Sequence, residues 1–162
     1  MFRMLLLTLC LFPLLQADET IYRTLEDAHA KNSILLFYTT WCPACKKSVE
    51  LLNDVQQHYP QSVKILGINL DDGVLRKNYL KETPVGFDTV PMTQQQAAGY
   101  GVSGSVPVIY VLDADLQIVK RYFKVPNPSL FMRLIGRLQA GYLENGTLPI
   151  EERIDLWQRK RN

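Results

Sequence analysis

The sequence predicts an α/β fold in which a central mixed β-sheet is flanked by helices. Short apolar runs alternate with helix-like segments in the order strand, helix, strand, helix, helix, strand, strand, helix. The first two predicted strands are connected through a helix, so they should be parallel. The last two are connected by a three-residue turn at residues 113–115, so they should be antiparallel.

Length and composition limit the classes of protein to consider. The 162 residues suit one domain, and the content of 47% hydrophobic and 21% charged residues argues against wholesale disorder and against a coiled coil. Eighteen Lys and Arg residues face 16 Asp and Glu residues, for a net charge of +2. This balance gives no broad basic surface for nucleic acid, so no nucleic-acid partner is expected.

The N-terminus has the pattern of a secretory signal peptide. Arg3 precedes an apolar run over residues 4–15, after which the chain turns polar around Ala17. The run is shorter than the roughly 20 residues that span a bilayer. We therefore expect a cleaved signal at 1–17 and a periplasmic or other extracytoplasmic location. An uncleaved membrane anchor and a lipid-attached Cys10 are the alternatives.

In the first half of the chain, residues 34–38 form a continuous apolar run, typical of a strand buried on both faces of a sheet. A helix is predicted for residues 43–59, because Pro43 suits a first helical turn and Pro60 cannot continue a helix. Its core-facing stripe comprises Cys45, Val49, Leu52 and Val55. The other elements expected in this half are a helix at 22–31, a strand at 63–70 and a short helix at 74–81.

In the second half, Pro107 opens an apolar strand at 108–112, and residues 117–125 should form its hairpin partner. Ser129 is expected to cap a helix that runs to about Leu143. The other segments are a loop at 83–91 and a weak helix at 93–100. The main domain should therefore cover 18–147. The amphipathic extension at 148–162 would either dock on that domain or contact a partner or membrane surface.

Cys42 and Cys45 carry the chemistry. Residues three apart at the start of a helix lie on one face, so the two sulfurs should be within reach of each other. Free N–H groups and the helix dipole stabilise a thiolate at Cys42, and Cys45 can then resolve a mixed disulfide. A C-x-x-C motif beside a βαβ pattern indicates a redox site that needs no cofactor other than its own disulfide.

Two other uses of the cysteine pair are a zinc site and a structural disulfide. A zinc site requires four ligands, and besides carboxylates the mature chain adds only His29 and His58, neither with partner spacing. A purely structural disulfide would close a gap of two residues, where the loss of chain entropy gives least stabilisation. Both are weaker than the redox interpretation.

The residues FYTTWCPACKK (37–47), GINLD (67–71) and YGVSGSVPVIYVLD (100–113) resemble the thioredoxin superfamily. Within it, the chain is most similar to exported TlpA/DsbE-like thiol–disulfide oxidoreductases, over about residues 34–138. The resemblance implies a thioredoxin-like fold, with Cys42 attacking and Cys45 resolving. It also implies a shielding ring at Trp41 and a cis-proline at Pro107 facing the cysteines. Val106 would offer its backbone to an extended substrate, and the expected substrate-binding residues are Trp41, Pro43, Val106 and Pro107.

The chain departs from these families at the expected proton acceptor. Thioredoxin has a buried acidic residue in the strand before the motif, where residues 35–36 are leucines here. Many TlpA-like chains have a glutamate after the second cysteine, where this chain has Ser48. Water, Asp71 or Asp72 is left to take the proton of Cys45.

The sequence therefore predicts an exported thiol–disulfide oxidoreductase, which the resemblance favours as a reductase. Its partners would be proteins with cysteines or disulfides and a membrane electron donor. A DsbA-like thiol oxidase and a non-catalytic thioredoxin-like chaperone or assembly factor are the alternatives. An SCO-like copper carrier fits less well, since the chain has no histidine after His58.

Overall fold

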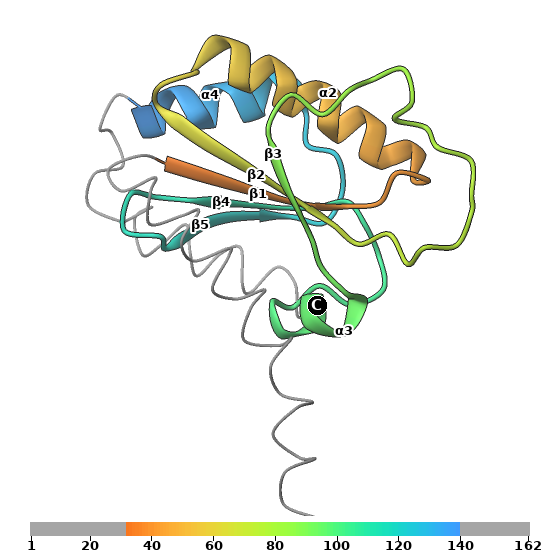
Figure 1. Cartoon of the computed structure of the whole chain (residues 1–162). Coiled ribbons are helices and arrows are strands. Elements are labelled where there is room, and N and C mark those ends of the chain that lie inside the picture. Colours follow the sequence, from red (N-terminus) through yellow and green to blue (C-terminus); the bar gives the residue numbers. More distant parts are fainter. Residues whose placement is uncertain (1–31, 140–162) are drawn as a thin grey trace, which may run out of the picture.

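The computed structural model describes residues 32–139, which form a five-stranded sheet in the order β3-β2-β1-β4-β5 (Figure 1). The first three of its strands in the chain are mutually parallel, whereas β4 runs antiparallel to β1 and β5 antiparallel to β4. The mixed sheet and both predicted strand directions are confirmed. The strands are β1 (Asn32–Tyr38), β2 (Val63–Asn69), β3 (Asp88–Pro91), β4 (Val108–Leu112) and β5 (Ile118–Tyr122).

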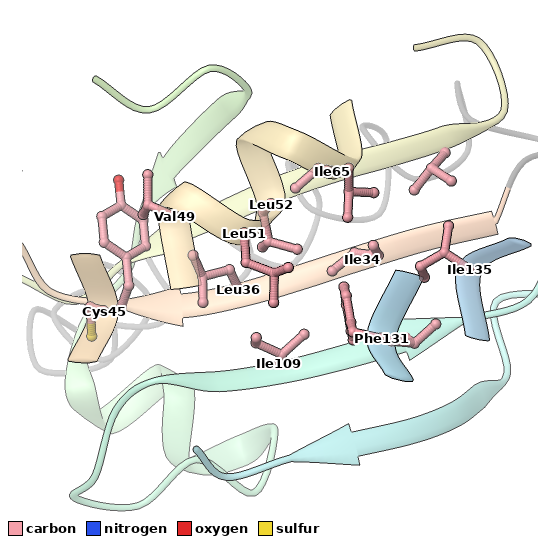
Figure 2. Close-up of a cluster of buried hydrophobic side chains, with 14 of the residues drawn as sticks. Ile34, Leu36, Cys45, Val49, Leu51, Leu52, Ile65, Ile109, Phe131 and Ile135 are labelled. Carbon is pink, nitrogen blue, oxygen red and sulfur yellow. The ribbon is translucent and has the colours of Figure 1, made fainter. Parts of the chain in front are cut away.

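The central strand β1 lies between β2 and β4, and all its residues except Asn32 are buried. On one face, α2 (Pro43–His58) and α4 (Pro128–Gln139) cover the sheet, as Figure 1 shows. Side chains of β1, α2 and α4, including Ile34, Leu52 and Ile135, form the cluster in Figure 2. A second cluster on the opposite face includes Phe37 and Ala97 of the short helix α3 (Gln94–Gly99).

Helix α2 presents the predicted apolar stripe to this core. Cys45, Val49, Leu52 and Val55 are all completely buried. Pro43 occupies the first turn, and the helix ends before Pro60. On the exposed side, Lys46 and Glu50 lie one turn apart. The prediction for this element is confirmed because an uninterrupted stripe of helical period has only one way to be buried.

The predicted helix at 74–81 is wrong. Residues 71–87 form a long loop, in which the side chain of Val74 is 58% exposed and that of Leu75 is 100% exposed. The Asp72 carboxylate accepts the N–H of Val74, and the Asn78 side chain accepts the N–H of Leu80. These local bonds give the backbone an alternative to helix, and only Leu80 of the expected apolar residues is buried.

The predicted loop at 83–91 is wrong at its end, where β3 pairs with β2 at the edge of the sheet. Most of β3 is exposed, so it lacks the apolar pattern of a strand. Its terminal Pro91 is tolerated because an edge strand has one unpaired side.

The last helix begins slightly earlier than predicted. The side chain of Asn127, and not that of Ser129, accepts a helical N–H, from Leu130 at 3.2 Å. Pro128 then takes the first helical position, where its missing N–H is not needed. The helices predicted at 43–59 and 93–100 and the strands at 34–38, 63–70, 108–112 and 117–125 are confirmed within a few residues.

Several predictions fall outside the described residues: the signal at 1–17, the helix at 22–31, the end of the last helix and the extension at 148–162. Between residues 32 and 139, none of the helices has the length and apolar character needed to cross a membrane.

Candidate functional site

The site lies where β1 passes into α2. Only residues 39–42 separate the two elements, so Cys42 is held at the mouth of the helix. Its backbone N–H donates to the carbonyl of Thr39 at 3.4 Å. Its sulfur occupies the N-cap position and accepts the N–H of Cys45 at 3.2 Å. A sulfur thus takes the place of the oxygen that usually caps a helix.

The two cysteines differ in environment. Both are free thiols, with Cys42 8% exposed and Cys45 completely buried one turn into α2. Figure 2 shows Cys45 at one end of the apolar cluster. Burial raises the pKa of the Cys45 thiol, and the hydrogen bond with Cys42 raises it further. Cys45 is therefore the inner member of the pair, and its burial disfavours the thiolate form.

The loop before β4 contacts the sulfur of Cys42. The Sγ of Cys42 donates to the carbonyl oxygen of Val106 at 3.6 Å, across 64 residues of sequence. The Val106–Pro107 peptide bond is cis. Pro107 is buried, and Val106 is half-buried against both apolar clusters. The fold thus brings Val106 and Pro107 to the cysteine pair.

Trp41 is half-buried and packs against the cluster that includes the cysteines. The guanidinium of Arg76 lies 4.6 Å from the centre of its ring. Asp72 holds Arg76 through both carboxylate oxygens, and this bond holds the pKa of Asp72 down to about 2. Pro43, the fourth expected substrate-binding residue, is exposed beside Cys42. The loop at 71–87 therefore places a cationic side chain over the ring of Trp41.

The carboxylates considered as proton acceptors have other partners. Asp71 accepts the N–H of Thr40 at 2.9 Å and its hydroxyl at 2.7 Å. Asp72 binds Arg76. The groups that act on the pKa of Cys45 are Cys42 and Thr39, and neither carries a carboxylate.

Sequence reasoning missed Thr39 and Arg76. Thr39 is completely buried between β1 and Cys42, and only its closeness to the motif pointed to it. Arg76 falls in the predicted helix at 74–81, which does not form, so its place over Trp41 has no signature in the sequence.

Three comparisons place the chain among known proteins. The model of the AhpC/TSA family matches residues 12–121. The thiol-disulfide oxidoreductase ResA of Bacillus anthracis is 28% identical over 100 residues, covering 60% of this chain and 57% of that protein. ResA of Bacillus subtilis (strain 168) is 29% identical over 99 residues, covering 59% and 55%. The chain thus spans somewhat more than half the length of these curated relatives.

Solved structures share the fold. A putative thiol:disulfide interchange protein DsbE from Chlorobium tepidum matches with a TM-score of 0.58 and 21% identity, covering 70% of this chain and 84% of that one. The thioredoxin-like superfamily protein SPOA0173 matches with a TM-score of 0.61 and 18% identity, covering 71% and 84%. The thioredoxin-like fold expected from the sequence is confirmed.

Proposed function

The chain belongs to the AhpC/TSA family, and from this premise we propose that it is an exported oxidoreductase that reduces protein disulfides through Cys42 and Cys45. The observation that carries the proposal is the position of the Cys42 sulfur, which caps α2 and accepts the N–H of Cys45. The name thiol-disulfide oxidoreductase, which the ResA relatives bear, supports the same chemistry.

In the first step, the Cys42 thiolate attacks one sulfur of a substrate disulfide. The capping N–H and the helix dipole stabilise its negative charge. The substrate S–S bond breaks, and its electron pair leaves with the other substrate sulfur, which takes up a proton. A mixed disulfide between Cys42 and the substrate remains.

In the second step, Cys45 attacks the Cys42 sulfur of the mixed disulfide. The second substrate thiol is released, and a Cys42–Cys45 disulfide forms. Two electrons have then passed from the cysteine pair to the substrate. Because Cys45 is completely buried, substrate disulfides reach Cys42 first, which supports the assignment of attacking and resolving roles.

Protein substrates would bind around Trp41, Pro43, Val106 and Pro107. The main chain of Val106 lies beside the Cys42 sulfur, which suits an extended segment that adds to the backbone there. Since each turnover leaves the pair oxidised, a reductase needs an electron donor. For an exported enzyme, that donor would be a membrane protein.

The direction of the reaction is testable in the producing cell. Rapid acid quenching followed by alkylation with a mass-adding maleimide would record the redox state of Cys42 and Cys45, in periplasmic or other exported fractions. A reductase should be found mostly with both thiols reduced. A mostly oxidised pair would contradict the proposal and favour the oxidase alternative.

A further inference from the structure

The loop at 71–87 is fastened to the segment that carries the cysteines. The Asp71 carboxylate accepts both the N–H and the hydroxyl of Thr40, at 2.9 and 2.7 Å. The N–H of Tyr79 donates to the carbonyl oxygen of Thr40 at 2.9 Å. Figure 1 shows the loop passing the N-terminal end of α2. The first half of the loop is therefore fixed next to the cysteine motif.

Within this half, Asp72 holds a turn on both sides of Leu75. One of its carboxylate oxygens accepts the N–H of Val74 at 3.2 Å, and both oxygens bind the guanidinium of Arg76. That guanidinium lies 4.6 Å from the centre of the Trp41 ring. Leu75 is thus presented by a fixed turn, directly before the residue that covers Trp41.

Val74 and Leu75 expose apolar side chains in this turn, at 58% and 100%. The other large apolar side chains exposed among residues 32–139 lie on or beside β5 and α4: Ile118, Phe123 and Leu130. A single exposed apolar residue is ordinary. Two consecutive ones, held in place beside a reactive cysteine, offer apolar surface that a partner gains free energy by covering.

The charged groups around this pair have local partners. Arg76 is bound by Asp72, and the Lys77 ammonium lies 4.8 Å from the centre of the Tyr79 ring. The cations of the turn are therefore engaged within the loop, while its apolar side chains face solvent. An apolar side chain matches this surface better than an acidic one.

We propose that Leu75, together with Val74, is a specificity-determining contact that binds an apolar side chain close to the disulfide of a protein substrate. The inference rests on the proposed function and names its substrate class, a disulfide flanked by apolar residues. Trp41 adjoins Cys42, and Arg76 contacts its ring. A substrate side chain within about four extended residues of the attacked cysteine, roughly 13 Å, can therefore reach the turn.

The test compares two peptides, each oxidised to a disulfide-linked dimer. One carries leucine and valine within four residues of its cysteine, and the other carries serine and threonine at the same positions. With a small dithiol as electron source, the full chain should show a higher kcat/KM for the apolar peptide.

Leu75→Ser should lower the ratio of the two kcat/KM values about tenfold, the size expected when one leucine side chain loses a partial burial. The loss should appear in KM for the apolar peptide, because the contact binds substrate and transition state equally. Since Leu75 is fully exposed, the variant should fold as the wild type does, which urea denaturation checks.

Leu130 provides the matched control. It is 59% exposed on α4, and its neighbour Phe131 packs on Tyr122 of β5 with ring centres 5.5 Å apart. The sheet order places β5 and β2, the strand that leads into the loop, on opposite sides of β1. Leu130→Ser should keep the wild-type ratio.

Three results would overturn the inference: an unchanged ratio in Leu75→Ser, an equal fall in Leu130→Ser, or a wild type without preference for the apolar peptide. A wild type that reduces neither peptide would instead refute the proposed function.

Discussion

Cys42 and Cys45 show how two identical side chains acquire different properties three residues apart. Cys42 lies at the helix mouth, where it contacts a backbone N–H and the carbonyl of Val106. Cys45 lies among apolar side chains, and its burial raises its pKa. The sequence predicted the pair and put Cys45 on the core-facing stripe, and the structure adds the contacts and the burial that distinguish the two thiols.

The raised pKa of Cys45 makes the stability of the reduced protein depend on pH. An unfolded cysteine loses its proton near pH 8.5, whereas buried Cys45 keeps its proton well above that value. Between the pKa of the unfolded thiol and that of buried Cys45, the folded state binds more protons than the unfolded state. The stability that Cys45 contributes is therefore fully present below pH 8.5 and is lost as the pH rises. We expect the free energy of unfolding to fall by up to about 1.4 kcal/mol per pH unit above pH 8.5.

Urea denaturation of the reduced protein at several pH values from neutral to just below the titration of tyrosine measures this slope. Cys45→Ser removes the group and serves as the control. Its slope should be shallower than that of the wild type. Parallel slopes for the two proteins would show that Cys45 does not remain protonated in the folded state.

At the scale of elements, the spacing of apolar residues predicted the helices and strands that are regularly buried. Helix α2 has one apolar face and strand β1 is apolar on both faces, so the burial of each follows from the periodicity of its sequence. The loop at 71–87 and the edge strand β3 are mostly exposed, and pattern gave little guidance there. Their conformation depends on particular contacts, such as the Asn53 side chain, which binds Gly86 and Pro84.

Gly67 of β2 lies in close contact with side chains of β1, β3 and the loop at 71–87. A Cβ added there would lie 3.0 Å from Thr89 Cγ2, 3.1 Å from Phe87 and 3.1 Å from Tyr38. Gly67→Ala should overpack this junction and reduce the free energy of unfolding by about 1–3 kcal/mol, as measured by urea denaturation.

Gly99 provides the comparison at the end of α3, where a Cβ would meet nothing within 4 Å. Gly99→Ala should be neutral or slightly stabilising, because it only reduces the freedom of the unfolded chain. If both alanine variants were equally stable, the close approach at Gly67 would have no energetic consequence.

At the scale of the whole molecule, the sheet order determines which distant residues meet. Pairing of β4 beside β1 carries the preceding loop to Cys42, so that Val106 lies against a sulfur 64 residues earlier. A motif resemblance suggested this meeting, whereas periodicity alone did not. The contacts of Thr39 and Arg76 lay beyond prediction, since each depends on side-chain packing and not on a repeat in the sequence.

The net charge of the chain bears on the proposed recognition of substrates. The chain has a net charge of only +2, so long-range steering of partners should be weak. If the proposed function holds, we expect recognition to depend on short-range contacts around Trp41 and Val106, where apolar and backbone groups lie beside the Cys42 sulfur.

Reduction of a protein disulfide by the full chain tests the central claim most directly. Insulin with a small dithiol as electron source is a suitable assay, comparing wild type with Cys42→Ser and Cys45→Ser. Wild type should accelerate reduction, Cys42→Ser should fall to the dithiol background, and Cys45→Ser should accumulate a mixed disulfide with insulin. Undiminished reduction by Cys42→Ser would contradict the assignment of the activity to this cysteine pair.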